Sequence, residues 1–582
     1  MSRRTALHSP PCHPCGLDPQ PDRAAPIQLD GAAKQSLEVG RTRLLVTGLV
    51  FALAFFSIGV RLVEVSLLPG DMVRLTADAQ ANTTTQRGDI VDRNGVVLAK
   101  TLPSVSLYAN PTEIRNPATV AERLSRTLPG LDETKLAARL ASKRSFVWVK
   151  RNLTPRQQAA VIRLGIPGLN FQNEPIRVYP QGSLVSHAVG FTDIDSRGLA
   201  GIERAFDSSL QQGAEPVALS LDVGVQHILT EELSAAIDEF RAIGAAGLVL
   251  DVETGEILAM ASLPTFDPRK PGAASKDARF NRATLGIYEM GSVFKIFTTA
   301  MALDQGVVGL NDGYDVTDPI KASRFIIRDY KPKKGWLSVP EIFMYSSNIG
   351  TVHMAMEAGT PSQQAFMRDL GLTQPLPFEL LEAGQPLIPS PWREINTMTI
   401  SYGHGLAVSP LQLTNAVAAM VNGGVLRPAT LLKRAEGEPV PGERVISEET
   451  SEAVRWMMRL VVQHGTGRKA EAAGYLVGGK TGTADKLNGR RYARDSRISS
   501  FVAAFPMDKP RYVIFAMVDE PKGNKSTFGF ATGGWVAAPV VQGVVQRMGP
   551  MMGLQPHSPE VAASIDDLMT PAAVRGFTLA SD

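Results

Sequence analysis

A serine and a lysine three residues apart stand at the start of a strongly apolar stretch, and their types and spacing could do chemistry. Ser292 and Lys295 lie in the run 288–295, and residues 296–303 that follow are mainly apolar. This pattern predicts a tight turn leading into a helix that is apolar nearly all round, as in the middle of a large domain. Because residues three apart lie on one face of a helix, the hydroxyl and the amine are expected to be neighbours.

Such a pair could form an activated nucleophile. Lys295 is the only basic residue in this run, and an ammonium among apolar neighbours loses hydration, which lowers its pKa. A neutral amine can then accept the proton of a serine nucleophile, and the N–H groups at the start of the helix suit a developing oxyanion. The alternative is a buried helix with a snorkelling lysine, because this spacing is expected by chance about once in a chain of this length.

Two further runs carry residues of the same kind. Ser346 and Asn348 lie in the run Tyr345-Ser346-Ser347-Asn348, and Lys480 begins the run Lys480-Thr481-Gly482-Thr483-Ala484 on a predicted strand. A second cation near Lys295 would further disfavour its protonation. Taken alone, the first run could be a turn or N-cap serine and the second an edge-strand lysine. The three runs in this order and these contexts are not expected by chance.

The three runs resemble the S-x-x-K, S-x-N and K-T-G motifs of penicillin-binding proteins and serine β-lactamases. The resemblance implies that Ser292 is the acyl-forming nucleophile, that Lys295 is its base and that Ser346 relays a proton to the leaving amine. This chain has Ser347 where many relatives have aspartate and Met290 where many have proline. Neither position is expected to do chemistry.

The same resemblance implies how the substrate is held. Asn348 is expected to hold the peptide of the substrate. The backbone N–H groups of Ser292 and Thr483 are expected to form the oxyanion hole. The terminal carboxylate is expected to be bound by Lys480, Thr481 and Thr483, and Gly482 is a further substrate-binding residue of this run. No metal and no organic cofactor is implied.

The composition excludes some other classes of protein. The chain has 582 residues, 60 basic and 57 acidic, with a net charge of +3. This charge is too small to indicate binding to nucleic acid. Its only cysteines are Cys12 and Cys15, so the folded part has no disulfides. With His13 they could bind zinc, but the surrounding prolines favour a disordered tail. No Gly-x-Ser-x-Gly or His-Glu-x-x-His run supports an α/β-hydrolase or a zinc peptidase.

The N-terminal part reads as a membrane anchor. Residues 1–40 are predicted to be a disordered cytoplasmic tail, and residues 41–63 a single transmembrane helix, since 44–60 carry no charge. More basic residues precede the span than follow it, which places the N-terminus in the cytoplasm and the bulk of the chain in the periplasm. A buried globular helix is the alternative, and a cleaved signal peptide fits less well.

Two folded domains are predicted after the anchor. Residues 64–215 are expected to form an α+β pedestal, opening with a β-hairpin around Asn94-Gly95, with helices at 117–128, 133–142 and 154–164. Residues 216–550 are expected to form an α/β (α+β) domain: strands at 246–251 and 256–262, a long helical stretch to about 420, and three late strands. One central mixed sheet with helices on both faces follows from this order. Residues 551–582 are expected to be a loose tail.

The resemblance covers roughly residues 40–548 and extends beyond the motifs. The anchor, the 87–99 segment and Gly201-Ile202-Glu203 look like the pedestal of class B penicillin-binding proteins. Other stretches resemble the division-specific FtsI type, namely 402–406 with 409–413, 465–467, 474–475 and 531–539. No long N-terminal segment is available for a glycosyltransferase domain, so the bifunctional class A enzymes do not fit.

The resemblance implies a septal peptidoglycan D,D-transpeptidase, anchored in the inner membrane and inhibited by β-lactams. Its expected partners are the stem peptides of peptidoglycan, the membrane glycan polymerase FtsW and other division proteins. Three alternatives remain. An elongation-type class B enzyme shares all three motifs. A β-lactamase does not need the pedestal and anchor, and a penicillin-binding sensor or scaffold would need a cytoplasmic signalling domain, for which 1–43 are too short.

Overall fold

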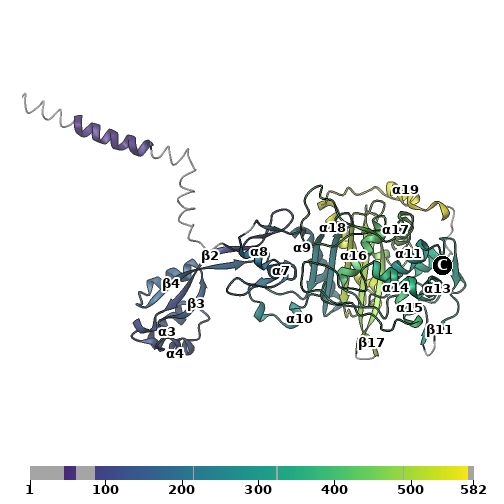
Figure 1. Ribbon diagram of the computed structural model, residues 1–582, viewed down its shortest axis with the longest axis horizontal. Helices are drawn as coiled ribbons and strands as arrows, with labels where there is room; N and C mark the ends of the chain where they lie inside the picture. The colour runs from purple at the N-terminus through teal and green to yellow at the C-terminus, as the bar shows by residue number, and fades with distance from the viewer. Residues whose placement is uncertain (1–44, 61–85, 214, 323–324, 489–490, 575–582) are drawn as a thin grey trace, which may run out of the picture. The chain divides into compact units, whose positions relative to one another are not determined.

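The computed structural model of the chain describes residues 45–60, 86–213, 215–322, 325–488 and 491–574 (Figure 1). The chain divides into two compact units, Met1–Thr84 and Thr85–Asp582. In the first unit, residues 45–60 form a helix. Among the described residues, no helix has the length and apolar character needed to cross a membrane. Residues 41–44 and 61–63 of the predicted anchor, the predicted tail 1–40 and both cysteines lie outside the described residues.

A five-stranded sheet forms the centre of the second unit. Its spatial order is β16-β17-β18-β8-β9, so two strands from before Ser292 join three from after it, as predicted. The strands are β8 (Gly244–Asp251), β9 (Ile257–Leu263), β16 (Gly478–Asn488), β17 (Arg491–Phe505) and β18 (Tyr512–Asp519). The sheet was predicted to be mixed, but every neighbouring pair is antiparallel. Hairpins join β8 to β9 and β16 through to β18, and antiparallel strands need only such short connections.

Helices cover both faces of this sheet, as the order of elements predicted (Figure 1). One face packs against α9 (Val223–Phe240) and α18 (Gly533–Met551). The other packs against α16 (Pro410–Val421) and, at β16, against α17 (Glu448–Gln463), and α11 (Lys295–Asp304) belongs to the same core. Side chains of β8 alternate between the two apolar cores, because successive residues of a strand point to opposite faces.

The stretch between α11 and α16 is less helical than predicted. Its helices are α12 (Val339–Tyr345), α13 (Asn348–Ala358), α14 (Thr360–Asp369) and α15 (Glu394–Ser401). Residues 313–338 instead form four short strands, β10 (Gly313–Asp315), β11 (Ile320–Ala322), β12 (Phe325–Ile327) and β13 (Trp336–Ser338). The prediction of one helical stretch is wrong here, because Pro319, Pro332 and Gly335 interrupt any helical pattern.

The pedestal region begins with the predicted hairpin. Strands β1 (Ile90–Val91) and β2 (Val97–Ala109) pair antiparallel around the Asn94-Gly95 turn. The far part of β2 belongs to a lobe with its own apolar core. This lobe contains β3 (Val147–Leu153), β4 (Leu169–Val178), α3 (Pro117–Thr127), α4 (Glu133–Leu140) and α5 (Pro155–Arg163). The three predicted helices are therefore present, each within two residues of the expected ends.

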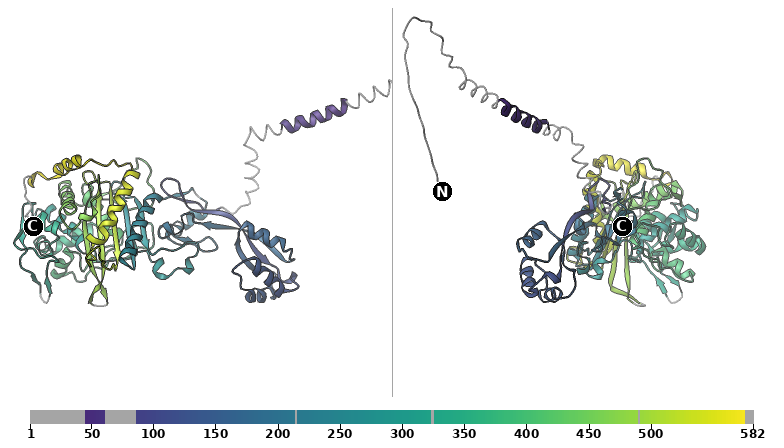
Figure 2. Two further views of the ribbon diagram at one scale, coloured as in Figure 1. Left: turned by 180° about the vertical axis from the view of Figure 1, so that it is seen from behind. Right: turned by 60° about the vertical axis from the view of Figure 1, so that its left-hand side comes forward.

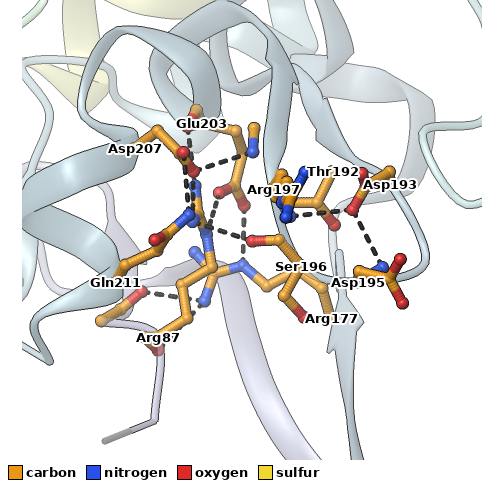
Figure 3. A network of polar contacts seen from close by, with 12 residues as sticks. Arg87, Arg177, Thr192, Asp193, Asp195, Ser196, Arg197, Glu203, Asp207 and Gln211 are labelled. Carbon is orange, nitrogen blue, oxygen red and sulfur yellow. Dashed lines mark hydrogen bonds and ion pairs between the residues drawn. The ribbon is translucent and has the colours of Figure 1, made fainter.

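A buried ion network fastens the base of this lobe (Figure 3). The carboxylate of Glu203 is fully buried and accepts one hydrogen bond from Arg87 Nε and one from Arg177 Nε, each at 2.7 Å. Arg87 also donates to Asp207 at 2.6 Å. Charge-assisted hydrogen bonds offset the cost of burying these groups. Residues 87, 177 and 203, far apart in sequence, thus meet at one point, and two of them lie in the stretches that look like a class B pedestal.

The C-terminal segment is not the loose tail that was expected. Residues Pro559–Met569 form helix α19, which lies on the outside of the larger unit (Figure 2). Arg459 of α17 donates to Asp566 of α19 at 2.9 Å, to Glu471 at 2.9 Å and to the Val477 carbonyl at 2.9 Å. The partly buried Ala562, Ile565 and Met569 also pack against the large apolar core. The tail prediction missed the helix because none of its residues is fully buried and no strong apolar pattern marks it. Since Val477 directly precedes β16, α19 supports the strand that begins with the Lys480 run.

Asp566→Asn should lower the melting temperature by a few degrees. The change leaves the buried Arg459 guanidinium with one carboxylate fewer, and a charge-assisted hydrogen bond contributes about 1.5–3 kcal/mol. Thermal unfolding followed by circular dichroism measures the effect. The exposed neighbour Asp567 supplies the control, because Asp567→Asn removes the same charge without touching Arg459. Equal melting temperatures for the two variants would contradict the role given to α19.

Candidate active site

Ser292 sits in a single 3₁₀ turn, Gly291–Phe294 (η4), and α11 begins at Lys295. Gly291 has φ +56°, and a Cβ there would collide with the Thr483 carbonyl. A Cβ on Gly403 would in turn collide with the Gly291 carbonyl. Only glycine fits at these two positions. The close backbone contact holds the Ser292 turn against β16.

Lys295 is fully buried and lies at the centre of the polar contacts. Its Nζ is 3.0 Å from Ser292 Oγ, 2.6 Å from the Ser346 carbonyl oxygen and 2.7 Å from Asn348 Oδ1. A carbonyl and an amide oxygen can only accept hydrogen bonds, so they take two N–H groups of the amine. In a neutral amine the lone pair then remains for the Ser292 hydroxyl. The geometry therefore matches a base that accepts the proton of Ser292.

We call the turn between α12 and α13 the Ser346 corner, and Ser346 makes two contacts with Lys295. Helix α12 ends at Tyr345, and Ser346 follows in the left-handed conformation with φ 63°. A residue other than glycine is uncommon in this region, which is enriched at functional sites. Both Oγ and the carbonyl oxygen of Ser346 thereby reach Lys295 Nζ, at 3.0 and 2.6 Å. Helix α13 then begins at Asn348.

Lys480 brings a second amine to the same corner. It is fully buried on β16, and its Nζ is 3.0 Å from Ser346 Oγ. Burial lowers the pKa of Lys480 to about 7. The pKa of Lys295 is held well below its usual value, first by burial and then by repulsion from Lys480, while Asp329 acts in the opposite direction. The predicted depression of the Lys295 pKa therefore has both expected causes.

The rest of the Lys480 run lines the edge of β16. The hydroxyl of Thr481 is 2.9 Å from that of Thr466, and Thr483 Oγ1 accepts from the Gly533 backbone N–H at 3.1 Å. Gly482 lies so close to Met290 that a Cβ would be 2.6 Å from its carbonyl oxygen. The Thr483 nitrogen lies 3.1 Å from the position that a Cβ on Gly291 would occupy. The two backbone groups expected to form an oxyanion hole are thus on adjoining segments.

Asp329 is a site residue that the sequence analysis missed. Its carboxylate is largely buried and accepts hydrogen bonds from Ser347 Oγ at 2.7 Å and from the Ile349 N–H at 3.1 Å. It also accepts from the Asn348 N–H, so it caps the N-terminus of α13. A hydroxyl at position 347 suits this arrangement, because an aspartate there would face a second carboxylate. No motif marks Asp329, which lies 18 residues before Ser347 in an irregular segment.

Three further residues contact the catalytic motifs and lie in stretches to which the sequence analysis assigned no role in the site. Gly403, Thr466 and Gly533 belong to the runs 402–406, 465–467 and 531–539, which resemble the division-specific type. All three contact the catalytic motifs, at Gly291, Thr481 and Thr483. Among the residues that the structure describes, no group of histidine, cysteine, aspartate and glutamate could hold a metal ion.

Comparison with known proteins identifies the family. Residues 245–546, more than half of the chain, match the model of the penicillin-binding protein transpeptidase domain, and residues 82–219 match that of the penicillin-binding protein dimerisation domain. The chain is a class B penicillin-binding protein. The family, the fold and the two-domain organisation expected from the resemblance are confirmed.

Similar proteins span most of this penicillin-binding protein. A probable peptidoglycan D,D-transpeptidase FtsI of Caulobacter vibrioides is 43% identical over 81% of this chain and 82% of its own length. A probable peptidoglycan D,D-transpeptidase PenA of Neisseria meningitidis is 35% identical over 82% of this chain and 87% of its own. The crystal structure of penicillin-binding protein 3 from Mycobacterium tuberculosis, complexed with aztreonam, has 26% identity and a TM-score of 0.66, covering 82% of this chain and 98% of that one.

Lys480→Met should stabilise the folded protein most at low pH. The pKa of Lys480 in the folded protein is about 7, against 10.5 for an ordinary lysine. Below pH 7 the buried side chain is therefore charged, and this lowers the free energy of unfolding by the full cost of burial. That cost disappears as the pH rises from about 7 to 10.5. We expect the variant to be more stable by about 2 kcal/mol or more at pH 6, with the difference shrinking towards pH 10. Denaturant unfolding at several pH values measures it.

Lys486→Met on the same strand is the control. Lys486 donates to Asp519 and Glu520 at 2.9 Å. Burial lowers its pKa, but the hydrogen bonds that it donates to these two carboxylates outweigh burial and raise the pKa. Its contribution to stability is therefore present below pH 10.5, and Lys486→Met should destabilise there. If Lys480→Met also destabilised at pH 6, the assigned cost of the buried Lys480 charge would be wrong.

Proposed function

We propose that this protein is the septal peptidoglycan D,D-transpeptidase of its cell, a serine-type D-Ala-D-Ala transpeptidase that cross-links stem peptides during division and is acylated by β-lactams. The observation that carries the proposal is the 3.0 Å contact between Ser292 Oγ and the buried amine of Lys295, inside a transpeptidase domain. Relatives named peptidoglycan D,D-transpeptidase FtsI support the reaction and the septal role.

The acylation step begins at Ser292. Its Oγ attacks the carbonyl carbon of the D-Ala-D-Ala bond while Lys295 Nζ accepts the hydroxyl proton. The backbone N–H groups of Ser292 and Thr483 stabilise the oxyanion of the tetrahedral intermediate. The C–N bond then breaks, and the proton held by Lys295 passes through the Ser346 hydroxyl to the departing nitrogen of D-alanine. Ser346 fits this relay because it lies 3.0 Å from both lysines.

The same groups serve the second step in reverse. An amine from a neighbouring stem peptide attacks the acyl-enzyme, loses its proton towards Ser346 and Lys295, and releases the Ser292 oxygen. We assign Lys480, Thr481 and Thr483 to the terminal carboxylate of the first peptide, with Gly482 in the same substrate-binding run, and Asn348 to the backbone of that peptide. A β-lactam imitates this first peptide and leaves a slowly hydrolysed ester on Ser292.

The proposal includes a location and a partner. We assign residues 41–63 to a single membrane span with the N-terminus in the cytoplasm, which leaves the pedestal and the transpeptidase domain in the periplasm. The uncharged run 44–60 and the bias of basic residues support this orientation. A membrane glycan polymerase of the FtsW type would supply the uncross-linked strand.

Benzylpenicillin should form a stable adduct on the full-length protein in detergent, and the labelled peptide should contain Ser292. Ser292→Ala should abolish the adduct, because it removes the hydroxyl that is expected to attack the carbonyl carbon beside the Lys295 amine. Ser346→Ala is the matched control, since it removes a neighbouring hydroxyl but keeps the nucleophile and should label more slowly at the same peptide. Intact-mass spectrometry measures both. An adduct that survives Ser292→Ala would refute the assignment, and rapid hydrolysis by the wild type would indicate a β-lactamase.

A fluorescent fusion of the full-length chain should gather in rings at mid-cell. Septal cross-linking is needed only where the new wall forms, so the signal should appear before constriction and follow it. Fluorescence microscopy of dividing cells measures the pattern. Patches along the lateral wall would favour an elongation enzyme and refute the septal assignment.

A further inference from the structure

A basic and aromatic segment lies beside the active site and has no role in the mechanism above. We call residues 325–336, from β12 to the start of β13, the basic arm. Four of its residues are basic and one is acidic, and that acid, Asp329, is turned inward. The arm also exposes four large apolar side chains, namely Phe325 (51%), Ile326 (53%), Tyr330 (69%) and Trp336 (55%). Such a concentration of exposed apolar and cationic groups is typical of a binding surface.

The basic arm is fixed to the active site at the Ser346 corner. The Arg328 carbonyl accepts a hydrogen bond from Asn348 Nδ2 at 2.8 Å, and the Asp329 carboxylate caps α13. Lys333 Nζ lies 4.4 Å from the centre of the Tyr345 ring, directly before Ser346. Residues 328–333 therefore adjoin the segment that contacts Lys295.

Three cations of the arm are exposed and have no carboxylate partner. Within the described parts of the chain, Arg328, Lys331 and Lys334 form no ion pair. Most exposed lysines are simply solvated, which is the plainer explanation for any one of them. Here three of them gather next to exposed rings within seven residues, while the whole chain of 582 residues carries a net charge of only +3. This local excess favours an anionic ligand with apolar faces.

We infer that the basic arm binds the acidic stem peptide of the acceptor strand, whose amine attacks the acyl-enzyme. The inference rests on the proposed function. Stem peptides carry carboxylates, which Arg328, Lys331 and Lys334 can bind, and exposed rings such as Tyr330 and Trp336 can pack against the attached sugars. The first peptide is assigned to the β16 edge through Lys480 to Thr483. The second peptide must approach the acyl group from elsewhere, and the arm adjoins the site through its contacts with Asn348 and Tyr345.

Charge reversal on the arm tests this inference with the full-length protein in detergent. The enzyme is acylated by a thioester that imitates the D-Ala-D-Ala donor. The acceptor is a soluble disaccharide-peptide with a free side-chain amine and free carboxylates. Lys331→Glu/Lys334→Glu should raise the acceptor KM about tenfold and shift the products from cross-linked peptide towards hydrolysis. Acylation by benzylpenicillin, which involves no acceptor, should stay within about twofold of the wild type.

Two controls make the result specific. Lys143→Glu/Lys509→Glu makes the same change in charge at exposed lysines elsewhere and should leave the acceptor KM unchanged. An acceptor with amidated carboxylates should bind the wild type weakly, and its affinity should fall little further in Lys331→Glu/Lys334→Glu. An unchanged acceptor KM in Lys331→Glu/Lys334→Glu would overturn the inference. A second result would also overturn it: slower acylation by the thioester donor, with an unchanged ratio of cross-linked to hydrolysed product. The arm would then bind the first peptide and not the acceptor.

Direct binding separates this inference from the proposed function. Isothermal titration of the acidic disaccharide-peptide should show salt-dependent binding to the wild type and loss of binding in the arm variant. If the wild type bound the peptide but could not be acylated, the proposed function would fail and the arm would stand as a binding site. If the wild type were acylated but the variant bound the peptide equally well, only the inference would fail.

Discussion

Two buried amines in contact with one hydroxyl cannot both keep a positive charge at low cost. Lys295 and Lys480 are fully buried, and each lies 3.0 Å from Ser346 Oγ. Loss of hydration disfavours each ammonium, and repulsion between them disfavours the doubly charged state further. The site therefore favours a neutral Lys295, with two N–H groups committed to the Ser346 carbonyl and Asn348 and a lone pair left for Ser292. A serine next to a charged ammonium would lack a base.

The rest of the domain maintains this arrangement. The five-stranded sheet places β16, and with it Lys480, against the Ser292 turn, where glycines allow the backbones to touch. Asp329 fixes the start of α13 and hence Asn348. Arg459 ties the residue before β16 to α17 and α19. These contacts suit a site that must stay rigid while it holds costly charges.

The sequence allowed prediction of the catalytic motifs and the central fold, because both depend on short-range signals. The spacing of Ser292 and Lys295 and the apolar strands could be read directly, and the family resemblance joined the distant runs. Asp329 and Arg459 could not be predicted in this way. Their partners lie 18 and 107 residues away in sequence, and one carboxylate or guanidinium leaves no periodic pattern. The strands at 313–338 were missed because strand pairs of three residues carry too little signal against neighbouring helices.

The most direct test of the buried-amine account is the pH dependence of Ser292 acylation by benzylpenicillin, compared between the wild type and Lys480→Met. Lys295 must be neutral to act as the base, so the rate should fall only as the pH drops through its lowered pKa. Removing the charge of Lys480 raises that pKa, and the acid limb of the variant should move to higher pH, whatever its maximal rate. Coincident acid limbs in the two proteins, or a wild type that acylates only near pH 10.5, would contradict the account.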